Sequence, residues 1–258
     1  MSLVSVERVG FGYTAGRRIL EDVSLDIAPG DTVGLVGESG SGKTTLLRLL
    51  LGLVRPDSGT IRFDGAPLDP RDRAFMRGFR RQAQVVFQDP YSSLDPRQKV
   101  FSIVAEPLRS LRVPGDHAAM VGDALEAVGL ERHAAGRYPH QFSGGQRQRI
   151  AIARAIVAGP RLLLADEAVS ALDLTTRVRI VELFARLSRR MSLLFVSHDI
   201  GVVAALCRRI VILERGRIVE AGDTAAVLAA PQHPYTRKLL ASVPRLSPEA
   251  PSSTEPPQ

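Results

Sequence analysis

Residues 37–44, with the sequence GESGSGKT, carry the clearest chemical signal in the chain. They fit the pattern of a phosphate loop, whose glycines let backbone N–H groups curl around phosphates without a Cβ clash. Lys43 can reach the β- and γ-phosphates, and the Thr44 hydroxyl can bind Mg²⁺. A strand before the loop and a helix after it argue against a chance run of glycines. We therefore predict an ATP site made of Gly37, Glu38, Ser39, Gly40, Ser41, Gly42, Lys43, Thr44 and Thr45.

Two adjacent acids, Asp166 and Glu167, follow the apolar strand at 162–165. Neighbouring carboxylates repel each other unless a cation or hydrogen bonds hold them, and Mg²⁺ bound with ATP would do so. Asp166 is therefore predicted to bind Mg²⁺, and Glu167 to polarise the water that attacks the γ-phosphate. The alternative is an ordinary acidic cap for the next helix, which the phosphate loop upstream makes less favoured.

A second glycine-rich turn, FSGGQ at 142–146, opens a helical stretch. A helix start attracts anions because its free N–H groups and its dipole both point outward. This turn has no lysine and no Mg²⁺ ligand of its own, so it cannot hold ATP alone. The sequence thus contains one good phosphate site and one incomplete one.

The segments that must position these groups alternate between strands and helices. Strands are expected at 4–13, 19–27, 32–37 and 59–65, with a buried helix at 43–53 between the last two. Residues 89–158 are mostly helical, and strands and helices alternate again from 161 to 222. This order predicts an α/β fold with a mostly parallel sheet, an N-terminal antiparallel β subdomain and a helical insertion.

The predicted organisation is one cassette at 1–244. Its core and β subdomain take residues 1–88 and 159–222, its helical subdomain 89–158, and its C-terminal helices 223–244. The tail at 245–258 is rich in Pro, Ser and Glu, and we expect it to be disordered.

Composition sets broader limits. The 258 residues are 45% apolar and 24% charged, as in soluble globular proteins, and the net charge of +7 suits anionic partners as well as a plain solvated surface. One cysteine, Cys207, cannot form an internal disulfide. The start lacks a signal-peptide layout and no apolar run approaches ~18 residues. We expect a soluble, cytoplasmic protein that can still dock on a membrane protein.

The order of these motifs resembles that of the ATPase subunits of ABC transporters over about residues 4–244. The resemblance implies that Tyr13 stacks on adenine and that Gln88 touches Mg²⁺ and the attacking water. It further implies that Asp173 crosses a dimer interface and that His198 contacts the γ-phosphate. Taken singly, Tyr13 also fits an ordinary strand aromatic, Asp173 a helix cap and His198 a structural histidine. The signature residues that would cover a partner's ATP are Ser143, Gly144, Gly145 and Gln146.

Two positions depart from the family pattern. Phe142 stands where leucine is more usual, and Ala168 stands where many members have proline. Phe142 is not expected to touch phosphate, and Ala168 bears on the stiffness of the loop rather than on the chemistry, so we expect an active site.

Two longer segments resemble oligopeptide, dipeptide and nickel importer ATPases, the second, F-type ATPase of dipeptide systems most of all. They are FQDPYSSLDPRQKV at 87–100 and PQHPYTRKLLASVP at 231–244. The resemblance implies a second cassette, more often a paralogue, two membrane permeases and an extracytoplasmic solute-binding protein. It also implies a place on the cytoplasmic face of the membrane. The solute stays open between peptide, nickel and another small molecule.

Another class of function is a non-transport ABC ATPase acting on nucleic acid, or a soluble assembly ATPase. The chain has one phosphate loop, and only 54 residues without sustained heptads separate Gln88 from Ser143. Both observations, together with the two importer-like segments, favour a transport subunit and no nucleic-acid partner.

Overall fold

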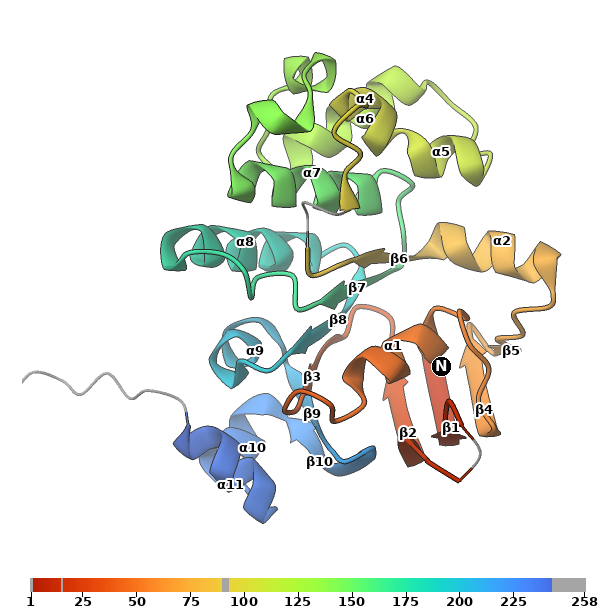
Figure 1. Ribbon diagram of the computed structural model, residues 1–258, viewed down its shortest axis with the longest axis vertical. Coiled ribbons are helices and arrows are strands. Elements are labelled where there is room, and N and C mark those ends of the chain that lie inside the picture. The colour runs from red at the N-terminus through yellow and green to blue at the C-terminus, as the bar shows by residue number, and fades with distance from the viewer. Residues whose placement is uncertain (1, 15, 90–92, 243–258) are drawn as a thin grey trace, which may run out of the picture.

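The computed structural model of the chain describes residues 2–14, 16–89 and 93–242. Within them lie an antiparallel sheet, a mostly parallel sheet and a separate group of helices (Figure 1). The predicted fold class is therefore confirmed. The predicted subdomain boundaries stay predictions, and the tail at 245–258 lies outside the described residues.

The mostly parallel sheet brings the predicted site residues to one edge, where its parallel strands end. Its strand order is β10-β9-β3-β8-β7-β6, and β10 alone runs antiparallel to its neighbour within the described residues. Because the carboxyl ends of parallel strands meet at one edge, the segments following β3, β7 and β8 lie close together. The strands are β3 Thr32–Val36, β6 Ala83–Val86, β7 Leu162–Asp166, β8 Ser192–Ser197, β9 Arg209–Glu214 and β10 Arg217–Asp223.

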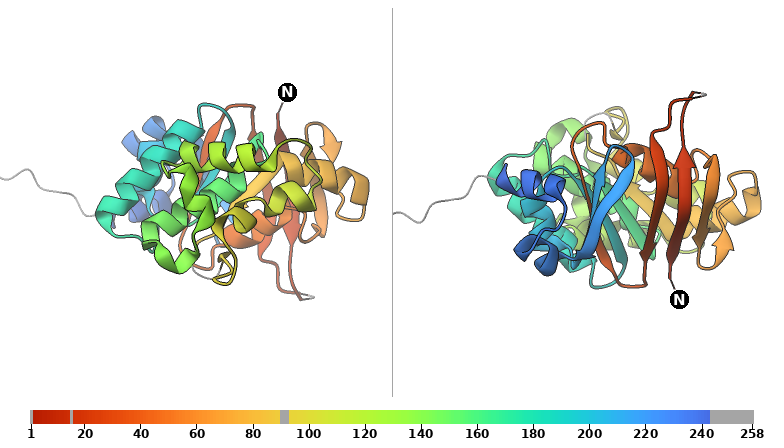
Figure 2. Two further views of the ribbon diagram at one scale, coloured as in Figure 1. Left: turned by 90° about the horizontal axis from the view of Figure 1, so that it is seen from above. Right: turned by 90° about the horizontal axis from the view of Figure 1, so that it is seen from below.

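The antiparallel sheet has the strand order β2-β1-β4-β5. Val23, Leu25 and Ile27 alternate along β2 and are all buried, as a strand with one covered face requires. The sheet lies beside the β9–β10 hairpin (Figure 2), where the Glu21 N–H donates to the Gly216 carbonyl at 2.9 Å. Its strands are β1 Val4–Phe11, β2 Leu20–Ile27, β4 Ser58–Phe63 and β5 Ala66–Pro67.

The helices fall into two sets. The first packs around the sheets: α1 Lys43–Leu50, α2 Arg73–Gln82, α8 Leu174–Leu187, α9 Ile200–Leu206, α10 Thr224–Ala229 and α11 Pro234–Ala241. The second forms the helical group: α4 Val100–Val104, α5 Glu106–Ser110, α6 His117–Ala127, the 3₁₀ turns Arg132–Gly136 and Pro139–Gln141, and α7 Gly144–Ile156. None of the helices in the described ranges combines the length and apolar character that crossing a bilayer requires.

Proline explains one division in the helical group. The sequence 101–112 gives two short helices, α4 and α5, rather than one. Pro107 has no N–H to donate and would clash with the turn before it inside a helix, but it is tolerated in a first turn. It lies at the start of α5, just after α4 ends.

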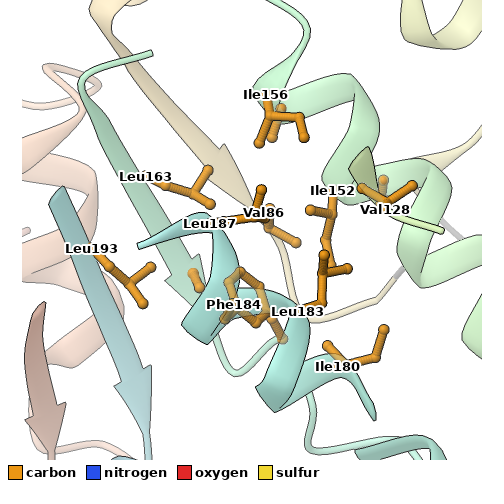
Figure 3. Close-up of a cluster of buried hydrophobic side chains, with 14 of the residues drawn as sticks. Val86, Val128, Ile152, Ile156, Leu163, Ile180, Leu183, Phe184, Leu187 and Leu193 are labelled. Atoms are coloured by element: carbon orange, nitrogen blue, oxygen red, sulfur yellow. The ribbon is translucent and has the colours of Figure 1, made fainter. Parts of the chain in front are cut away.

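The signature helix α7 is fixed to the sheet by a shared apolar cluster. Ile152 and Ile156 of α7 point toward Leu183 and Phe184 of α8 and toward the strands beneath them (Figure 3). All four side chains are buried. Burying each aliphatic or aromatic side chain of this size contributes about 1.5–3 kcal/mol, so this cluster holds the second half of α7 against α8 and the sheet.

Candidate functional site

The phosphate loop has the geometry that its glycines predict. It leaves the end of β3 and leads into α1 at Lys43. Gly40 and Gly42 have φ values of 80° and 109°, a region that side chains other than glycine avoid. A Cβ at Gly40 would meet nothing within 4 Å, so open space for a ligand adjoins the loop there.

Lys43 stands inside this loop. Its ammonium donates to the carbonyls of Gly37 at 2.7 Å and Glu38 at 2.9 Å, and the residue is only 6% exposed. Burial lowers the pKa of Lys43, while the charges of Glu167 and Asp166 act in the opposite direction. A phosphate group would give this ammonium a charge-assisted partner in place of neutral carbonyls.

The predicted acid pair stands at the end of β7. Burial raises the pKa of Asp166, and the neighbouring charge of Glu167 raises it further, against the opposing effect of Lys43 and Arg48. The two carboxylates thus stand close together in a partly buried place, and each opposes the ionisation of the other. A hard divalent cation fits such a set of oxygen donors.

Glu167 adopts an unusual backbone conformation with φ 46°. Its N–H donates to the Val196 carbonyl of β8 at 2.9 Å, which ties the turn to the neighbouring strand. His198, after β8, places Nδ1 3.4 Å from Glu167 Oε2. The structure therefore brings together two of the three predicted catalytic residues.

Gln88, the third, reaches the same turn through an intermediate residue. Its Nε2 donates to Ser170 Oγ at 3.3 Å, and Ser170 Oγ donates to the Glu167 carbonyl at 2.9 Å. Ser170 was not predicted from the sequence. The available signal was a serine three residues after the acid, since serine often hydrogen-bonds a nearby backbone group.

The signature residues lie at a separate place. Ser143 caps α7: the Gln146 N–H donates to Ser143 Oγ at 3.3 Å, and Gln146 Oε1 accepts from the Ser143 N–H at 3.0 Å. A Cβ on Gly145 would lie 2.5 Å from Thr176 Cγ2, so only glycine allows this approach to α8.

Asp173 caps α8 by accepting from the Thr176 N–H at 3.0 Å. It lines a hollow of about 250 Å³ together with Gln88, Ser143, Gly144 and Gly145. The helix-cap interpretation of Asp173 is therefore what this structure displays, and its part in a dimer stays a prediction. The phosphate loop borders other hollows than this one.

Tyr13 shares a hollow with the phosphate loop. The ring is half exposed, and its hydroxyl accepts a hydrogen bond from Arg48 Nη1 at 2.9 Å. With Gly40, Arg17 and Arg215 it lines a space of about 640 Å³. An aromatic ring and a phosphate loop around one space suit the base and the phosphates of a single nucleotide.

Gln148 is a further residue that the sequence analysis did not single out. It is fully buried, and its Nε2 donates to the Ala168 carbonyl at 2.7 Å. The bond joins α7 to the residue after Glu167. Because it uses only the backbone carbonyl of residue 168, alanine at this position can make it. Phe142 is also buried, with the Arg137 guanidinium 4.4 Å from its ring centroid.

The fold and the site together define a P-loop ATPase cassette. The profile of the family described as "ABC transporter" matches residues 20–170, more than half of the chain, and the chain belongs to this family of ATP-binding proteins. A second profile, "Oligopeptide/dipeptide transporter, C-terminal region", matches residues 219–258. Within the family the chain is thus of the oligopeptide/dipeptide type.

Known relatives agree with this placement. The "Glutathione import ATP-binding protein GsiA" of Escherichia coli (strain K12) is 51% identical over 233 residues, and that of Salmonella typhimurium is 50% identical. Each alignment covers 89% of this chain but 37% of the relative, so the chain spans little more than a third of those proteins.

Two solved structures have the same fold. cbiO1 from Clostridium perfringens, part of the cbiONQ transporter complex, has a TM-score of 0.82 at 28% identity, covering 94% of this chain and 96% of its own. The ATP-binding cassette MJ0796, a dimer bound to ADP and Pi, has a TM-score of 0.74 at 30% identity, covering 86% and 98%.

Proposed function

We propose that the chain hydrolyses ATP to drive the import of a peptide-like solute through a membrane transporter. One observation carries the hydrolytic part: the phosphate loop, Asp166, Glu167 and His198 converge at one edge of the parallel sheet. The C-terminal match to oligopeptide and dipeptide transporters supports the kind of cargo.

ATP would lie with its base at Tyr13 and its phosphates in the loop at 37–45. Lys43 would exchange its two carbonyl partners for phosphate oxygens. Thr44, Gln88 and Asp166 would hold Mg²⁺ through their oxygen atoms, and the ion when bound would neutralise charge on the phosphates.

Glu167 is the group placed to accept a proton from the attacking water. Its side chain is only 20% exposed, and the side chain of His198 beside it is more than half exposed, on the side where a γ-phosphate would approach. Gln88 is connected to the same turn by its hydrogen bond to Ser170. Phosphoryl transfer needs mainly charge stabilisation and positioning, which these groups provide.

The signature would complete the site of a second cassette. It opens α7 beside a hollow that Ser143, Gly144 and Gly145 line, but it has no lysine or Mg²⁺ ligand of its own. Ser143 and Gly145 of one chain would therefore cover the γ-phosphate held by the partner's phosphate loop. ATP would hold two cassettes together, and hydrolysis would release them.

Mixing two inactive variants tests this arrangement. Ser143→Ala damages the signature and Lys43→Ala the phosphate loop, so a mixed dimer regains one intact site of its two. Random pairing of two copies is expected to restore about one quarter of the wild-type ATPase rate. Asp116→Ala, which removes a cap from α6 in the same helical group, controls for the loss of a helix cap. The test applies where the chain pairs with itself, which size-exclusion chromatography of the mixture with ATP checks. No recovery in a mixture that forms dimers would place the signature in its own chain's site.

Import needs further chains. The proposed partners are a second cassette, most simply a paralogue, two permeases and an extracytoplasmic solute-binding protein, with this chain on the cytoplasmic face of the membrane. Glutathione, which the GsiA relatives are named for, is a peptide-like solute. The finer assignment to an F-type dipeptide subunit, and the alternative of nickel cargo, stay open.

Co-purification from membranes tests the importer assignment. The tagged chain is expected to bring down two permease subunits, and peptide is expected to stimulate ATP hydrolysis when the solute-binding protein is added. A partner set made only of soluble proteins or nucleic acid would contradict the proposal.

A further inference from the structure

The C-terminal helix α11 touches the phosphate loop directly. Tyr235 and Lys238 lie three residues apart on α11 and so share one face of it. The Tyr235 hydroxyl accepts a hydrogen bond from the Glu38 N–H at 2.8 Å. The Lys238 ammonium lies 3.0 Å from Glu38 Oε1. Residues almost 200 positions apart thus meet at one residue of the loop.

Glu38 is held from both sides. Its N–H and carboxylate bind α11, while its carbonyl accepts from Lys43 Nζ at 2.9 Å and from the Ser41 N–H at 3.2 Å. The Glu38 N–H belongs to the same peptide as the Gly37 carbonyl, which accepts from Lys43 Nζ at 2.7 Å, so the C-terminal helix fixes a peptide that receives the Lys43 ammonium. A shift of α11 would move this carbonyl and with it the resting place of Lys43.

The start of α11 is itself rigidly built. The Glu220 carboxylate of β10 accepts from the N–H groups of Gln232 at 2.8 Å and His233 at 3.0 Å. His233 Nδ1 accepts from the Tyr235 N–H at 3.2 Å, and Pro234 takes the first helical position. Tyr235 is only 7% exposed. The hydrogen bonds around His233 and Pro234 thus fix the position of Tyr235 independently of its contact with the phosphate loop.

We propose that Tyr235, supported by Lys238, is a positioning residue for the phosphate loop. It acts through Glu38 on Lys43 and touches no nucleotide itself. The C-terminal region of this chain is then part of the machinery that binds ATP. The inference rests on the proposed ATP site.

Tyr235→Phe removes only the hydroxyl and keeps the buried ring. In the full chain we expect amide hydrogen exchange at Glu38 to accelerate, while the amides of β3 keep their protection. Losing one hydrogen bond in the loop is expected to raise the Kd for ATP and the KM by about fivefold, with kcat little changed. Lys238→Gln should act in the same direction but more weakly, because this ion pair is exposed, and Lys238→Arg should restore wild-type values.

The controls separate this inference from the function on which it rests. Tyr138→Phe removes a hydroxyl in the helical group and is expected to leave the Kd for ATP unchanged. A wild-type chain that fails to bind ATP would overturn the proposed function. A wild-type chain that binds ATP, with Tyr235→Phe showing the same Kd and the same exchange at Glu38, would overturn the positioning role alone. Lys238→Gln lies at an exposed side chain, so it gives a folded variant if Tyr235→Phe does not.

Discussion

Replacing Glu167 with glutamine is expected to lower the rate of ATP hydrolysis by about 10²- to 10⁴-fold, the usual contribution of a general base. ATP binding should stay intact because glutamine has the same shape and the backbone bonds to Val196 and Ser170 remain. The change also removes a charge that raises the pKa of Asp166, so that carboxyl should ionise more readily. Phosphate release measures the rate of hydrolysis, and equilibrium titration measures ATP binding. Size-exclusion chromatography with ATP should show an accumulated dimer.

The matched control is the same substitution at Glu182, an exposed residue of α8 away from the acid pair. It is expected to keep the wild-type rate. Full turnover by Glu167→Gln would contradict the assignment of Glu167 as the base. Loss of ATP binding in that variant would point instead to a structural part for this turn.

Lys43→Ala is expected to weaken ATP binding by about 100-fold or more, because hydrogen bonds to charged groups contribute about 1.5–3 kcal/mol each and this ammonium can make two. Hydrolysis at cellular ATP concentrations should fall with it. Stability is expected to change less than ATP binding, because losing the two hydrogen bonds of Lys43 also relieves the cost of burying its charge, which lowers its pKa. Calorimetric titration with ATP and thermal unfolding measure the two quantities.

Lys99→Ala removes an exposed lysine from the start of α4 and provides the control for lost charge. Lys43→Met keeps most of the buried stem and checks that lost packing is not the cause. Normal ATP binding by Lys43→Ala would show that the loop at 37–44 is not a nucleotide site.

Local sequence was enough to predict most of the elements that position the site. The strand–loop–helix at 32–50, the strand before Asp166 and the strand before His198 each carry their own signal of apolar runs bounded by glycine or acid. Parallel pairing then brings the ends of these strands together, which is why residues as far apart as Lys43 and Asp166 lie at one end of the sheet. The amphipathic helix α2 and the short strand β6 were not predicted, although α2 has an Asp72 cap and buried Met76 and Phe79.

The contacts between elements could not be predicted in this way. Gln148 binds a carbonyl in another segment, and Tyr235 binds an N–H across 197 positions. Neither bond leaves a trace in local periodicity, because its energy depends on tertiary packing that brings a particular donor and acceptor together. Residues 223–244 were predicted to be helical, but the partner of Tyr235 in the phosphate loop followed only from the packed structure.

The left-handed turn at Glu167 sets a limit on engineering this chain. For a residue other than glycine such a conformation costs about 1–2 kcal/mol, and glycine or asparagine would relax it. A stabilising screen that scores backbone preference alone would therefore favour replacing the carboxylate that we propose activates water. Thermostability and turnover are opposed at this position, so a stabilised variant of the protein has to gain its stability from substitutions at other positions.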